Sequence, residues 1–139
     1  MPRRIVGALV VLLLLAPLSC RSDAERAEQG RLMNLAERID RLRRADNRDK
    51  RELLDGLKRT ECVGSDACGL KDLCVRAYQM HQQALDAIEA LKKLATGDAG
   101  PSPAVRERLR ITEQNLSDAQ KLGQECADQQ VRAVRKTLL

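Results

Sequence analysis

The sequence predicts an all-α fold of three long helices, and three observations support this prediction. Apolar residues recur at steps of three and four along most of the chain after residue 20, which is the period of one helix face. Residues 64–69 and 97–103 contain the glycines and prolines that end helices. Phe and Trp are absent, Tyr occurs once and 32% of residues are charged, so the core must consist of aliphatic side chains between solvated helices.

The first helix is expected at residues 23–60, with Ser22 in position to cap its N-terminus. Its apolar stripe consists of Leu32, Leu35, Ile39 and Leu42. Beyond this stripe, residues 43–52 are polar on every side of a helix, which indicates either an exposed stretch of continuous helix or a bend. We expect the stripe to be only partly covered by the rest of the fold.

The second and third helices are expected at residues 67–96 and 103–138, and the short connection between them favours an antiparallel hairpin with coiled-coil-like packing. If the turn centres on Gly100, residues whose numbers sum to 200 face each other. Nearly all such pairs are apolar or small, and the last one pairs Cys74 with Cys126. We therefore predict that a disulfide between these two cysteines joins the two helices.

Two disulfides are the expected state of the cysteines that follow Cys20. Four cysteines in a short chain are typical of disulfide bonding if the chain is exported, which the first twenty residues indicate, and the second bond would close the small loop between Cys62 and Cys68. A zinc site is the alternative, but structural zinc sites favour cysteine pairs only about two to four residues apart. The wider spacing here favours disulfides.

The first twenty residues are typical of an export signal. Arg3 and Arg4 precede an apolar run at residues 5–16, which is too short to span a bilayer, and Ser19 and Cys20 follow. The segment 17–20 resembles the lipobox of bacterial lipoproteins, although proline occupies the position where that family carries a large aliphatic residue. The resemblance implies that residues 1–19 are removed and that Cys20 carries diacylglycerol. An ordinary signal peptide with an incidental cysteine is the alternative.

Residues 20–139 would then form a single helical domain, with a first helix at 20–60 and a disulfide-tied hairpin at 61–139. Arg21 is not the aspartate that retains enteric lipoproteins in the inner membrane, so the resemblance favours the outer membrane, with the domain facing the periplasm. Without Arg3 and Arg4 the net charge of +5 falls to +3, which gives no argument for binding nucleic acid. His81 is the only histidine, and no motif for catalysis, a cofactor or a metal accompanies it.

The sequence therefore predicts a non-enzymatic, membrane-anchored lipoprotein that acts as an adaptor, similar in size and class to a secretion-channel pilotin. The stripe on the first helix would bind another envelope protein or a second copy of the chain. The alternative is binding of lipopolysaccharide or acidic lipid through a basic cluster at residues 41–51. This cluster consists of Arg41, Arg43, Arg44, Arg48, Lys50 and Arg51. Acidic residues are interleaved with it, which favours an ordinary solvated helix face.

Overall fold

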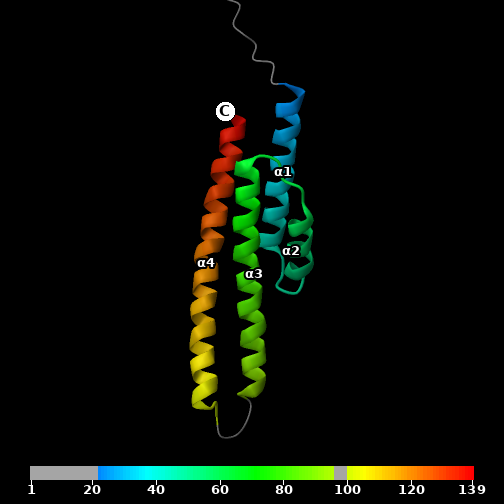
Figure 1. Ribbon diagram of the computed structural model, residues 1–139. Coiled ribbons are helices and arrows are strands. Elements are labelled where there is room, and N and C mark those ends of the chain that lie inside the picture. Colours follow the sequence, from blue (N-terminus) through cyan, green and yellow to red (C-terminus); the bar gives the residue numbers. More distant parts are fainter. Residues whose placement is uncertain (1–21, 96–99) are drawn as a thin grey trace, which may run out of the picture.

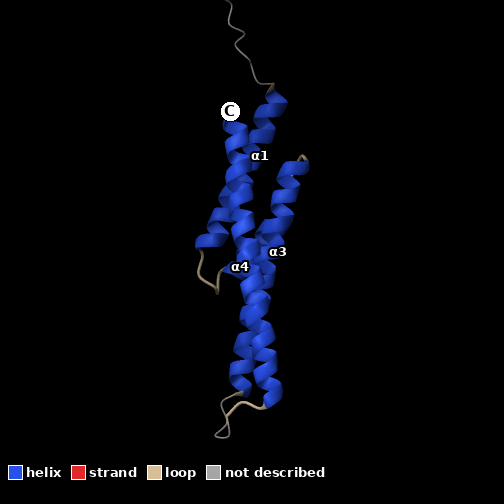
Figure 2. Cartoon of the chain, turned by 90° about the vertical axis from the view of Figure 1, so that its left-hand side faces the viewer, coloured by secondary structure: helices blue, strands red, loops and turns tan. Residues whose placement is uncertain are grey.

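The computed structural model describes residues 22–95 and 100–139, which form four helices and no strand. The helices are α1 (Asp23–Arg44), α2 (Lys50–Arg59), α3 (Ser65–Leu94) and α4 (Pro103–Leu138). The two long helices α3 and α4 lie side by side and run in opposite directions (Figure 1). α1 and α2 cover only one half of this pair, and the other half consists of α3 and α4 alone in both views (Figures 1 and 2).

Side chains near the ends of α1 and α4 explain where these helices begin. The Ser22 hydroxyl accepts a hydrogen bond from the Glu25 backbone N–H at 3.2 Å, and the Glu25 carboxylate accepts one from the Ser22 N–H at 2.7 Å. This reciprocal pair satisfies two backbone donors that the first turn leaves without partners. At the start of α4, the Ser102 hydroxyl accepts from the Val105 N–H, and Pro103 occupies the first turn.

The single first helix predicted at residues 23–60 is instead two helices. α1 ends at Arg44, and the Asp46 carbonyl oxygen accepts hydrogen bonds from the N–H groups of Asp49 and Lys50 in the turn that follows. α2 then runs back along α1 (Figure 1). The polar stretch is therefore a reversal of the chain. The physical reason is burial, because the reversal brings Leu54 and Leu57 of α2 into the same core as the α1 stripe.

All four helices contribute to this aliphatic core. Leu35, Ile39 and Leu42 of α1 are at most 1% exposed, and Leu32 is also buried. The prediction that this stripe stays partly uncovered is therefore wrong. The stripe is buried inside the fold and is not available to a partner. Its cover comes from α2, which was not expected as a separate helix, and from Leu70 and the paired Cys74 and Cys126 of α3 and α4. The stripe holds the fold together.

Two disulfides join the cysteines in the pairing expected from the sequence. Cys74 of α3 bonds to Cys126 of α4, with their Cα atoms 5.0 Å apart, and both side chains are fully buried. Cys62 bonds to Cys68 across the turn that leads into α3, with a Cα separation of 5.2 Å. Gly64 lies inside this small loop with φ +82, a backbone conformation that favours glycine. The first bond therefore joins two helices, whereas the second closes only a local turn.

Candidate functional site

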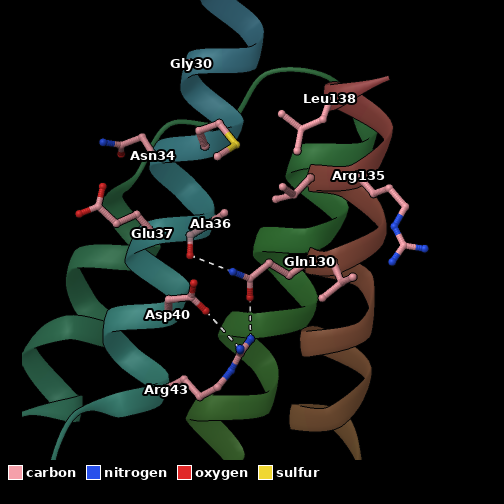
Figure 3. Close-up of a pocket in the computed structure, with 12 residues that line it drawn as sticks. Gly30, Asn34, Ala36, Glu37, Asp40, Arg43, Gln130, Arg135 and Leu138 are labelled. Atoms are coloured by element: carbon pink, nitrogen blue, oxygen red, sulfur yellow. Dashed lines mark hydrogen bonds and ion pairs between the residues drawn. The ribbon is translucent and has the colours of Figure 1, made fainter.

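An open groove lies between α1 and α4 on the half of the molecule that contains the core. Its volume is about 970 Å³. The residues that line it are Gly30, Met33, Asn34, Ala36, Glu37, Asp40, Arg43, Gln130, Val131, Val134, Arg135 and Leu138. Three large apolar side chains in it are substantially exposed: Met33 at 41%, Val131 at 56% and Leu138 at 64%. The groove thus exposes a row of apolar side chains beside the core (Figure 3).

A polar network crosses one end of the groove and connects its two walls. The buried Gln130 amide of α4 donates to the Ala36 carbonyl of α1 at 3.0 Å, and its Oε1 accepts from Arg43 Nη2 at 2.6 Å (Figure 3). Arg43 also forms an ion pair with Asp40 at 3.1 Å. The buried amide therefore has partners for both its donor and its acceptor, as a buried polar group requires. These contacts hold α1 against α4 and place Ala36 and Arg43 of α1 beside Gln130 of α4.

Sequence reasoning missed Gln130, because a polar residue was not expected to face another helix. A signal was present: Gln130 lies four residues after Cys126, which is the step that continues the seam of α4. A glutamine at a seam position indicates a specific hydrogen-bonding partner on another helix.

Each rim of the groove carries one exposed side chain of opposite charge, and the α1 wall also carries the Asp40–Arg43 ion pair. Glu37 projects from the α1 rim and Arg135 from the α4 rim, and the two side chains point away from each other at a similar level along the groove (Figure 3). Glu37 Oε1 lies 3.7 Å from Arg41 Nη2, but the Glu37 side chain is 71% exposed and the Arg41 side chain is 68% exposed. Such an exposed pair contributes little to stability and leaves the carboxylate accessible.

The basic cluster predicted at residues 41–51 does not form one surface. Arg43 lines the groove, Arg41 and Arg44 line a second hollow, and Arg48 and Arg51 line a third one beside α3. Several of the cations have acidic partners as well, since Arg43 pairs with Asp40 and Arg51 with Asp86 of α3 at 2.9 Å. Lys50 lines a separate pocket beside His81. The cluster is therefore divided among several surfaces, and because Arg41 pairs with Glu37, an ion pair partly neutralises the charge in each of the three hollows.

His81 lies half-buried in a shallow pocket next to Lys50, Tyr78 and Gln120. Burial lowers the pKa of His81 below its ordinary value of 6.5, and the nearby Lys50 ammonium lowers it further. The imidazole is consequently neutral near pH 7. Among residues 22–95 and 100–139, no group of three or more His, Cys, Asp or Glu side chains is placed to hold a metal ion.

The lowered pKa of His81 predicts a specific pH dependence of stability. Because the unfolded chain binds the proton more tightly than the folded chain, the free energy of unfolding should fall as the pH drops through about 6.5. Urea denaturation at pH 7.5 and pH 5.5 measures this loss, and His81→Gln should reduce it. His81 is the only histidine in the sequence, so no other imidazole could cause a loss in this pH range. An equal loss in the variant would therefore show that protonation of His81 is not its cause.

No protein-family model, curated protein or solved structure matches this chain. Within the described helices, none is both long and apolar enough to cross a bilayer. The expected signal peptide and Cys20 lie outside the described residues.

Proposed function

We propose that this protein is a non-catalytic, lipid-anchored helical component of the bacterial cell envelope that binds a helical protein partner, either another envelope protein or a second copy of the chain, in the groove between α1 and α4. The exposure of Met33, Val131 and Leu138 along this groove is the observation that supports the proposal. Contiguous exposed apolar side chains with a polar rim are characteristic of interaction surfaces. An amphipathic helix placed in such a groove would bury them.

The anchor part of the proposal rests on the sequence at residues 17–20. Acylation of Cys20 would place the lipid three residues before the start of α1. We propose the outer membrane as the location, with the helical domain facing the periplasm and its role being that of an adaptor. α3 and α4 would serve as a coiled-coil-like hairpin that supports α1, so that the groove keeps its shape.

Gly30 offers a way to block the groove without damaging the fold. It lies in the interior of α1 and lines the groove, and a Cβ atom added there would meet no atom within 4 Å. Gly56 in α2 also has open space around its Cβ position, but it lies outside the groove. Replacing either glycine by glutamine should raise helix stability by about 0.5 kcal/mol. Only the change at Gly30 puts a side chain into the groove.

Site-specific photo-crosslinking in bacteria that express the full-length chain tests the proposal. A photoreactive amino acid at Val131 should give adducts with a protein partner, and Gly30→Gln should remove them, whereas Gly56→Gln should not. The matched control places the same amino acid at Ile111, an exposed apolar residue of α4 outside the groove. Equal adducts from Ile111, or none from Val131, would contradict the proposal.

A further inference from the structure

We infer that the partner in the α1–α4 groove is a second copy of this chain, so that two copies form a parallel dimer. This inference rests on the proposed function, in which the groove is an interaction surface, and it identifies the occupant. The argument starts from the two rims. One rim presents the exposed carboxylate of Glu37, and the other presents the exposed guanidinium of Arg135 (Figure 3).

A surface with opposite charges on its two sides is complementary to itself. A half-turn about an axis along the groove places α1 of the second copy over α4 of the first, and α4 over α1. Because Glu37 and Arg135 lie at a similar level, each carboxylate then meets the guanidinium of the other copy (Figure 3). This is the geometry of an isologous interface, in which both copies use the same residues. The two ion pairs formed would be identical.

The apolar part of the groove has the same symmetry. Met33 belongs to the α1 wall, whereas Val131 and Leu138 belong to the α4 wall. The half-turn therefore packs Met33 of each copy against the exposed valine and leucine of the other. Burial of these side chains drives association, while the flanking ion pairs fix the orientation of the two copies. The apolar surface at the centre and the charges at the rim correspond to the usual layout of a protein interface.

The direction of the helices supports the parallel arrangement over the antiparallel one. A rotation axis that runs along the helices leaves their direction unchanged, so α1 begins at the same end of the dimer in both copies. Both lipid anchors could then insert into one membrane. An axis across the helices would instead place the two α1 helices over each other and the anchors at opposite ends. It would also keep Glu37 away from Arg135 of the other copy.

Charge reversal tests this pairing directly. Full-length protein purified in detergent should be a dimer by native mass spectrometry, and Glu37→Arg or Arg135→Glu alone should weaken the dimer by about tenfold or more. An equimolar mixture of the two variants, distinguished by tags of different mass, should form mixed dimers, because both contacts then join opposite charges. As a control, Glu107→Arg reverses a similarly exposed charge of α4 outside the groove and should leave the dimer intact.

The outcomes separate this inference from the proposed function. If the protein is monomeric, or if its dimer is unaffected by either reversal, the inference is wrong. Crosslinks from Val131 to a different protein would overturn the inference as well, but they would uphold the proposed function. If Val131 gives no adduct at all, the groove is not an interaction surface and both fail. Recovery of stable mixed dimers from two variants whose own dimers are weakened supports the inference.

Discussion

Replacing Cys74 and Cys126 together by alanine is expected to lower the free energy of unfolding by about 4 kcal/mol, the chain-entropy estimate for a loop of this length. The two residues are separated by 52 positions, so the bond removes much of the freedom of the unfolded chain. Both side chains are also fully buried where all four helices meet. The core contains no phenylalanine or tryptophan to compensate, because the sequence has none. Chemical denaturation followed by circular dichroism measures the loss.

The second disulfide provides the matched comparison. Cys62 and Cys68 are only six positions apart, so the same entropy estimate gives about 2 kcal/mol for their replacement by alanine. The larger loss should therefore belong to the bond between α3 and α4. Equal losses would show that the length of the closed loop does not determine the effect, and would point instead to strain or residual structure in the unfolded chain.

The parts of the fold that could be predicted are those that local chemistry determines. Ser22 and Ser102 begin helices because their hydroxyls accept from backbone N–H groups one turn later, a pattern visible in the sequence. The Cys74–Cys126 disulfide could be predicted because a turn centred on Gly100 between two periodic helices places these two residues opposite each other. Each of these inferences uses residues within one helix or across one short connection.

The remaining features depend on which helices lie against each other. The apolar period of α1 indicates that one of its faces is buried, but it does not say what covers that face. Polar residues at 43–52 are compatible with a straight helix in water and with a turn, and only the burial of Leu54 and Leu57 decides between them. The groove arises from the placement of α1 beside α4, which the buried amide of Gln130 fixes through a contact distant in sequence. No local pattern predicts such a pairing.

The burial of the α1 stripe leads to the second large prediction, in which Ile39→Ala lowers the free energy of unfolding by about 2–5 kcal/mol. Ile39 is 0% exposed and packs in the core that joins α1 to the other three helices. Removing its outer carbons therefore leaves a cavity as well as losing buried apolar area. If the stripe were instead an open surface for a partner, the same change would cost little stability and would weaken binding. Denaturation midpoints of the purified variant distinguish these two roles.

Met33→Ala is the matched variant on the same helix, and the two roles should be reversed there. Met33 is 41% exposed and lines the groove, so its truncation should cost no more than about 1 kcal/mol of stability. The substitution should, however, reduce crosslinking from Val131, because Met33 is the largest apolar side chain that α1 contributes to the groove. A large loss of stability at Met33 together with a small one at Ile39 would mean that α1 is rotated about its axis relative to the structure. Both the buried stripe and the groove would then have to be reassigned.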